Sequence, residues 1–304
     1  MKGKWFLILS IIGILTVTGL SLGLYFAFKP PPAVGITITD DVGRTVYING
    51  VPQRVIALAP SAAEILFALG QGNKIVGVTD QCDYPEEARA KPKVGAFWDP
   101  SVEQIVASGP DLVLSHYKPE LIPQLEEIGI TVIVLRPEDI DGILHNVVLI
   151  GQVIGAEERA QSLVAGMEQR IQAVTSKVEN AARPGVFYEG DCGSGIWTAG
   201  PGTFVNELIS LAGGSNVGAM KEGYYKISNE VLLEANDAID VIIWADMGGV
   251  PFASVANSLP WSGLTAVQTG KVYVFDPDLI NRPGPRIVDC LEDIARIIHP
   301  ELFG

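Results

Sequence analysis

Basic residues are scarce in this chain of 304 residues, and their scarcity excludes one class of partner. Lysine and arginine together number 21 against 35 aspartate and glutamate residues, which gives a formal net charge of −14 at pH 7. A nucleic-acid-binding surface needs clustered positive charge that replaces the counterions on the phosphates. We therefore expect no nucleic-acid partner.

Cysteine and histidine are equally rare, with three of each. Cys82, Cys192 and Cys290 lie far apart, and they form neither a C-x-x-C pair nor a zinc-finger spacing. Their odd number excludes a fully paired disulfide framework and leaves a single bridge open. The histidines are dispersed, which excludes a tight metal site built from two or three of them. We expect no metal site made by the chain alone.

The motifs of common enzyme classes are absent as well. The chain contains no G-x-S-x-G, no H-E-x-x-H and no G-x-x-x-x-G-K-[ST]. The glycine-rich stretch GDCGSG (190–195) follows a strand pattern, but it lacks the ending of a dinucleotide-binding motif and no helix pattern opens there. With no visible nucleophile–base pair, we expect a protein that is not an enzyme. An anchored α/β enzyme remains a distant alternative.

One long uncharged run lies near the N-terminus. It spans Trp5–Phe28, with Lys2 and Lys4 before it and Lys29 and three prolines after it. A secretory apolar region has about 7–15 residues, whereas a membrane span needs about 20. We therefore predict an N-terminal transmembrane anchor and linker at residues 1–35, with the basic end inside and the remainder extracytoplasmic. Cleavage of this segment stays open, and no cysteine near its end would allow lipid attachment.

Two blocks of alternating strand and helix patterns follow the anchor. Short apolar runs separated by helical patterns indicate parallel sheets in an α/β fold. Between the blocks lies a long helical pattern whose apolar residues recur every three or four positions. We predict two Rossmann-like lobes, at 36–155 and 184–304, joined by a single long α-helix at 156–183. A ligand cleft is expected between the lobes.

The residues that follow the strands are candidates for a ligand site, because the carboxyl ends of strands line the crevice of an open α/β sheet. Aromatic side chains gather there in both lobes, which suits a large, flat and partly apolar ligand. Any one of them could equally belong to the core. Ser61 and Glu64 after the first strand read as a helix-capping box. The candidate ligand-binding residues are Pro60, Phe97, Trp98, His116, Trp197, Tyr224, Tyr225, Asp278 and Arg282.

His116 is the only histidine at such a position, and two roles are open for it. It is either a plain polar residue of the cleft wall or a single axial ligand to the metal of a bound macrocycle. Axial ligation would make ligand binding weaken below about pH 6.5, where an unperturbed histidine takes up a proton.

A Ser-x-Glu helix start occurs once in each lobe, at Ser101 to Glu103 and again at Ser228 to Glu230. Each serine is expected as an N-cap, with its glutamate in the first turn of an exposed helix. Complementing the helix dipole would by itself explain either glutamate.

Several motifs, in order, resemble the substrate-binding proteins of ABC importers for cobalamin, iron-siderophore complexes and haem. They are DDVGRTV, PQRVIALAPSAAEILFALG, CDYPEEA, KPKVG, PSVEQIVASGPDLVL and NRPGPRIVD. The resemblance covers residues 36–304, and CDYPEEA and RPGPRI favour the cobalamin-binding branch. It implies two α/β lobes joined by one helix. It also implies ligand contacts at Pro60, Gln81, Phe97, His116, Tyr224, Asp278 and Arg282; Trp98, Trp197 and Tyr225 are added by position alone.

The resemblance also gives the repeated glutamates a role. In this family, one glutamate at the tip of each lobe pairs with arginines of the transporter's membrane subunits. Glu103 and Glu230 match those positions, and a matched pair fits a two-fold partner better than two independent caps do. The chain departs from the familiar pattern at Phe97, Tyr224 and His116, where other aromatic residues are usual.

These observations combine into one expected function. The chain is expected to be an extracytoplasmic, membrane-tethered protein that captures cobalamin or a related corrinoid and delivers it to the permease dimer of an ABC importer. Cobalamin would be transported ligand, and no cofactor of the protein's own is expected. Haem or a ferric siderophore is the alternative ligand.

Overall fold

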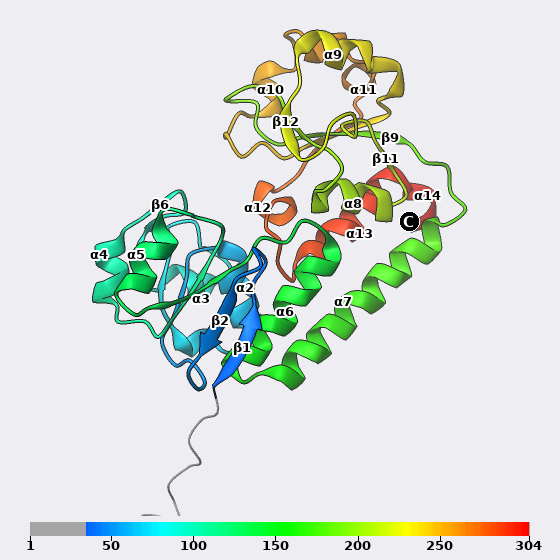
Figure 1. The fold of residues 1–304 in the computed structure, drawn as a ribbon. Helices are drawn as coiled ribbons and strands as arrows, with labels where there is room; N and C mark the ends of the chain where they lie inside the picture. The colour runs from blue at the N-terminus through cyan, green and yellow to red at the C-terminus, as the bar shows by residue number, and fades with distance from the viewer. Residues whose placement is uncertain (1–34, 304) are drawn as a thin grey trace, which may run out of the picture.

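A computed structural model describes residues 35–303, which form two α/β lobes (Figure 1). The predicted anchor falls on residues 1–34, outside the described part. Between residues 35 and 303, no helix combines the length and the apolar character needed to cross a bilayer.

The first lobe is built on a parallel four-stranded sheet in the order β4-β3-β7-β8. Its strands are β3 (Val55–Ala57), β4 (Ile75–Val78), β7 (Leu112–Ser115) and β8 (Thr131–Val134). Before this sheet in the chain, β1 (Ile36–Thr39) and β2 (Thr45–Ile48) form an antiparallel hairpin. The helices are α2 (Pro60–Ala68), α3 (Glu86–Arg89), α4 (Val102–Ala107) and α5 (Leu121–Glu127).

The second lobe repeats this plan with the order β11-β9-β13-β14. Its strands are β9 (Gly185–Glu189), β11 (Ser215–Asn216), β13 (Val241–Trp244) and β14 (Val272–Val274). An antiparallel pair, β10 (Trp197–Ala199) and β12 (Tyr224–Lys226), was not predicted. The helices are α8 (Phe204–Leu211), α9 (Asn229–Glu234), α10 (Phe252–Val255), α11 (Thr265–Gln268), α12 (Pro277–Ile280), α13 (Ile287–Ile298) and α14 (Pro300–Phe303).

Each parallel sheet has an apolar cluster on both faces. In β3, Val55 and Ala57 belong to one cluster while Ile56 belongs to another. In β13, Ile243 and Trp244 divide in the same way. Because successive side chains of a strand point to opposite faces, this arrangement makes each lobe a layer of strands between two layers of helices. It explains why the central strands read as continuous apolar runs.

Two helices, α6 (Ile140–Ile154) and α7 (Glu157–Val178), run side by side between the lobes (Figure 1). Ile143 of α6 packs in the core of the second lobe, while Ile150 packs in the core of the first. In α7, Ala160 and Met167 divide in the reverse order. The expected single connecting helix is therefore one of a pair, because the apolar stripe of α6 is long enough to serve both cores.

The close approach of α6 and α7 depends on Gly151. A Cβ atom added there would lie 2.3 Å from the Cβ of Ala160, which is fixed to its own backbone. Gly166 of α7 is exposed, and an added Cβ would meet nothing within 4 Å. The first glycine is therefore required by packing and the second is not.

We predict opposite effects for two matched substitutions. Gly151→Ala should destabilise the protein by about 1–2 kcal/mol, because the cost of overpacking exceeds the gain in helix propensity. Gly166→Ala should stabilise it by about 0.5–1 kcal/mol. Urea unfolding of both variants checks the pair, and a stabilised Gly151→Ala variant would contradict the packing.

Candidate functional site

Three aromatic side chains of the first lobe, Phe97, Trp98 and His116, form one cluster. Phe97 and Trp98 make the turn between β5 (Gly95–Ala96) and β6 (Asp99–Pro100), and His116 directly follows β7. The ring of Phe97 stacks on His116 at 3.9 Å between centroids and meets Trp98 edge-on at 4.6 Å. Trp98 is 74% exposed, so the cluster presents a broad apolar surface at the carboxyl end of the sheet.

Hydrogen bonds hold the turn of this aromatic cluster in place. The side-chain oxygen of Gln81 accepts from the backbone N–H of Phe97 at 2.7 Å. The ammonium of Lys118, a buried residue, donates to the carbonyl of Trp98. Gln81 thus acts on the cluster through the backbone, while the exposed ring of Trp98 stays free for a ligand.

His116 is electrically neutral near pH 7. Burial, together with the nearby charge of Lys118, lowers the pKa of His116 to about 4. Its Nδ1 atom is buried and has no hydrogen-bond partner. The ring is therefore uncharged at neutral pH. It takes up a proton only well below the pH of about 6.5 at which an unperturbed histidine does so.

The aromatic residues of the second lobe lie on the β10–β12 pair. Tyr224 and Tyr225 are adjacent on β12 and thus point to opposite faces of the pair. Tyr225 packs against the lobe's core and its hydroxyl donates to the carbonyl of Gly218 at 2.8 Å, whereas Tyr224 is exposed. Trp197 lies on β10, where its indole N–H donates to Ser194 at 2.9 Å. Of the two tyrosines, Tyr224 has the freer ring.

Asp278 lies in the first turn of α12, and Arg282 follows the end of this helix. The guanidinium of Arg282 contacts Asp278 at 2.6 Å, and it also reaches Asp83 at 2.7 Å and the carbonyl of Gln81 at 3.0 Å in the first lobe. Its side chain is only 9% exposed. The structure thus places Arg282 in an ion-pair network between the lobes, while Asp278 keeps about half of its side chain exposed.

Glu64 also belongs to this network, and its prediction as part of a capping box was wrong. Helix α2 begins at Pro60 with Ala59 as its N-cap, and no side chain caps it. Proline at N1 has the right φ and lacks an N–H that would need capping, so Ser61 falls inside the helix. Glu64 instead accepts hydrogen bonds from Arg286 at 2.7 and 3.0 Å. The sequence signal for this role was a single charged residue, Glu64, among the apolar residues of the helix start.

A group of carboxyls at the carboxyl ends of β9 and β13 was missed by sequence reasoning. Glu189 is fully buried, one of its oxygens accepts from the N–H of Asp191 at 3.0 Å, and the other has no partner. Asp246 accepts from the N–H of Cys192 at 2.7 Å. Burial and the neighbouring Asp246 raise the pKa of Glu189 to about 8. Glu189 therefore holds a proton at neutral pH beneath the loop that leads to Trp197.

The two Ser-x-Glu helix starts are confirmed as local structures. Ser101 caps α4 by accepting from the N–H of Gln104, and Ser228 caps α9 in the same way. Glu103 and Glu230 are exposed in the first turns of these helices. The two helices lie at the ends of their lobes, away from α7 (Figure 1). The backbone N–H and the Ser228 hydroxyl lower the pKa of Glu230, so it is ionised at neutral pH.

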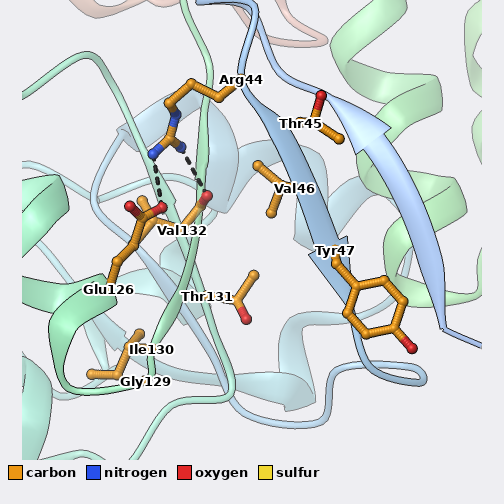
Figure 2. Close-up of a pocket in the computed structure, with 9 residues that line it drawn as sticks. All are labelled: Arg44, Thr45, Val46, Tyr47, Glu126, Gly129, Ile130, Thr131 and Val132. Atoms are coloured by element: carbon orange, nitrogen blue, oxygen red, sulfur yellow. Dashed lines mark hydrogen bonds and ion pairs between the residues drawn. The ribbon is translucent and has the colours of Figure 1, made fainter.

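A separate pocket of about 400 Å³ lies between β2 and β8 (Figure 2). Figure 2 shows Arg44 reaching across it to Glu126 and to the carbonyl of Val132, at 2.8 and 2.9 Å. Arg44 also pairs with the buried carboxylate of Asp40. This arginine fastens the hairpin to the edge of the sheet, and no predicted site residue lines the pocket.

Metal and disulfide chemistry is not indicated in the described part of the chain. Between residues 35 and 303, no three histidine, cysteine, aspartate or glutamate side chains are grouped so that they could hold a metal ion. Cys82, Cys192 and Cys290 are free thiols, and the single bridge left open by the sequence is not formed.

We predict that Glu189 makes the protein less stable at alkaline pH. The folded state retains this proton up to about pH 8, whereas an unfolded glutamate loses it near pH 4.5. Stability should thus fall as pH rises from about 4.5 to 8. Glu189→Gln should remove this loss. Its free energy of unfolding should exceed that of the wild type by on the order of 3 kcal/mol at pH 9 and differ little at pH 5. Thermal unfolding of the wild type and the variant across pH 5–9 measures this difference in stability, with the exposed Glu168→Gln as control. If the stabilities of wild type and Glu189→Gln change with pH in parallel, Glu189 is not protonated in the folded state.

Comparison with known proteins identifies the family. The sequence model of the periplasmic binding protein family matches residues 55–279. The uncharacterized ABC transporter substrate-binding lipoprotein YvrC of Bacillus subtilis (strain 168) is 33% identical over 277 residues, which cover 88% of this chain and 87% of that protein. A cobalamin-binding protein of Halobacterium salinarum is 32% identical over 276 residues, which cover 87% of this chain and 74% of that protein.

Solved structures agree with these relatives. The periplasmic vitamin B12 binding protein of Vibrio cholerae superposes with a TM-score of 0.71 at 28% identity, covering 82% of this chain and 97% of that structure. Other similar structures are described as heme-binding and as Fe3+-hydroxamate transport proteins. The resemblance indicated by the motifs is confirmed, and so is the prediction of a binding protein rather than an enzyme. This chain belongs to the periplasmic binding protein family.

Proposed function

We propose that this protein captures a corrinoid outside the cytoplasm and delivers it to an ABC importer. The observation that carries the proposal is the aromatic cluster of Phe97, Trp98 and His116, which offers an exposed apolar surface at the carboxyl end of the first sheet. A flat macrocycle with apolar faces is the class of ligand that such a surface fits. The relatives whose names include cobalamin and vitamin B12 support the same ligand.

The second wall of the ligand site is proposed to come from the other lobe. Trp197 and Tyr224 would contact the ligand from the β10–β12 pair, and Pro60 would contribute at the start of α2. Asp278 is half exposed and would accept hydrogen bonds from amide groups at the rim of a corrinoid. Gln81, Tyr225 and Arg282 would act by holding these elements, since their own polar groups are engaged within the protein.

Haem is the second candidate ligand, and His116 is the observation that favours it. A neutral imidazole has the chemistry of an axial ligand to iron or cobalt, and because Nδ1 is buried, ligation would use Nε2. The heme-binding proteins among the similar structures support this alternative. A change in the absorption bands of the bound ligand when His116 is replaced by alanine would distinguish ligation from simple contact.

The proposed location is the outer face of the cytoplasmic membrane. The uncharged run at Trp5–Phe28 and the lipoprotein name of the Bacillus relative both support tethering, although by different chemistry. The bound corrinoid would be cargo, released to the importer without chemical change.

We predict that calorimetry will show cobalamin binding with a Kd between nanomolar and low micromolar, roughly −12 to −8 kcal/mol. Affinity should be constant between pH 8 and pH 5, because His116 changes charge only near pH 4. Trp98→Ala should weaken binding by about 1–2 kcal/mol through lost aromatic contact. Tyr47→Ala, an exposed aromatic residue on the hairpin, serves as control and should leave affinity unchanged. Tight haem binding without any heat from cobalamin would reject the corrinoid.

We further predict that Glu103 and Glu230 dock onto the importer. The double variant Glu103→Lys/Glu230→Lys should keep its cobalamin affinity but lose uptake in vesicles containing the importer, because like charges would then face the permease arginines. Stability should change little, because both side chains are exposed at their helix starts. Glu157→Lys/Glu158→Lys makes the same charge change at the exposed start of α7 and should support normal uptake. If the first variant also transports normally, the docking role is disproved.

A further inference from the structure

Four charged side chains meet where the two lobes come together. From the first lobe come Glu64 of α2 and Asp83 of the loop after β4; from the second come Arg282 and Arg286, which lie between α12 and α13. Arg286 donates both ends of its guanidinium to Glu64, at 2.7 and 3.0 Å, and Arg282 donates to Asp83 at 2.7 Å. These hydrogen bonds join segments that are about 200 residues apart in the chain.

Glu64 is the centre of this network. Its side chain is only 2% exposed, and both of its oxygens accept from arginines of the other lobe. The guanidinium of Arg286 also lies over the ring of Tyr84, with 3.9 Å between its central carbon and the ring centroid. Removing one member of a buried ion pair leaves the other charge without compensation, so each arginine strongly favours the position beside Glu64.

The geometry of this contact differs from that of the α6–α7 pair. Apolar packing between the helices is not directional and fixes how close the lobes lie. A two-pronged guanidinium–carboxylate contact fixes both a distance and an angle. The network therefore restrains the rotation of one lobe against the other, which the helices restrain less strictly.

We propose that Glu64 is a positioning residue that fixes the angle between the two lobes before any ligand binds. Arg282 lies 3.4 Å from Glu64 and 2.7 Å from Asp83. Because it also contacts Asp278 at 2.6 Å, the network places Asp278 relative to the aromatic cluster of the first lobe. The consequence for ligand binding rests on the proposed function, whereas the lobe angle itself does not. A prearranged site lowers the ordering cost that a ligand has to overcome.

A neighbouring pocket gives Arg286 room to move when Glu64 is replaced by glutamine. It has a volume of about 430 Å³ and is lined by Glu64, Tyr84, Glu87 and Arg286, among others. Glu87 is exposed and shares this pocket, but it makes no ion pair with either arginine of the network. It therefore provides a matched control for a change of charge at this place.

The test measures the distance between spin labels on the two lobes of the ligand-free, full-length protein. Glu127→Cys and Lys271→Cys place one label on each lobe at exposed positions, in a Cys192→Ser background, since Cys82 and Cys290 are buried. The wild-type network should give one narrow distance distribution. Glu64→Gln should broaden and shift it, while Glu87→Gln should leave it unchanged. Glu64→Gln/Arg286→Met also lacks the two-pronged contact and should broaden the distribution as Glu64→Gln does, although it removes one charge of each sign.

Two further variants keep the test decisive. If Glu64→Gln does not fold, Arg286→Lys keeps the positive charge but loses the two-pronged contact and should also broaden the distribution. Ile56→Val destabilises the core of the first lobe without touching the network, and it should lower the melting temperature while the distribution stays narrow. A wild-type distribution in Glu64→Gln, or in Arg286→Lys if it has to take its place, would overturn the proposal whether or not cobalamin binds.

Discussion

Both parallel sheets carry apolar side chains on their two faces, and this constraint determines most of the molecule. Each face must be covered, so helices lie on both sides of each sheet and only the strand ends remain open. Two of the covering helices, α6 and α7, contribute to both lobes at once. Burying the sheets thus also joins the lobes, and it leaves the carboxyl ends of the strands as the place where ligand-binding side chains can gather.

The candidate site is made of surfaces rather than reactive groups. His116 is kept neutral by burial and by Lys118, and Glu189 is kept protonated by burial and by Asp246, so neither presents a charge at neutral pH. Trp98 adds an exposed apolar ring to this surface. A site of this kind is what the proposed capture and release of an unchanged ligand requires, and it agrees with membership of a family of binding proteins.

The acidic character of the chain is used in two different ways. Glu103 and Glu230 are exposed at helix starts, where their charge is available to a partner. Glu64 and Asp83 face arginines of the other lobe, where their charge serves the interior of the protein. The first pair is free for a partner, whereas the second pair joins the lobes because arginines lie opposite it.

Local patterns in the sequence predicted the α/β class and most strands of the two parallel sheets. Apolar runs predicted β3, β4, β7, β8, β9, β13 and β14 because buried parallel strands need apolar side chains on both faces, and serine spacing predicted the starts of α4 and α9 because capping is local. Motif order also indicated the family. Long-range packing, in contrast, pairs Glu64 with Arg286 instead of leaving it to cap α2, and it lets α6 contribute to both cores. It also turns Tyr224 and Tyr225 to opposite faces of an unpredicted strand pair. Each of these depends on residues far apart in the chain, and local spacing carries no information about which distant side chains the packing of two lobes brings together.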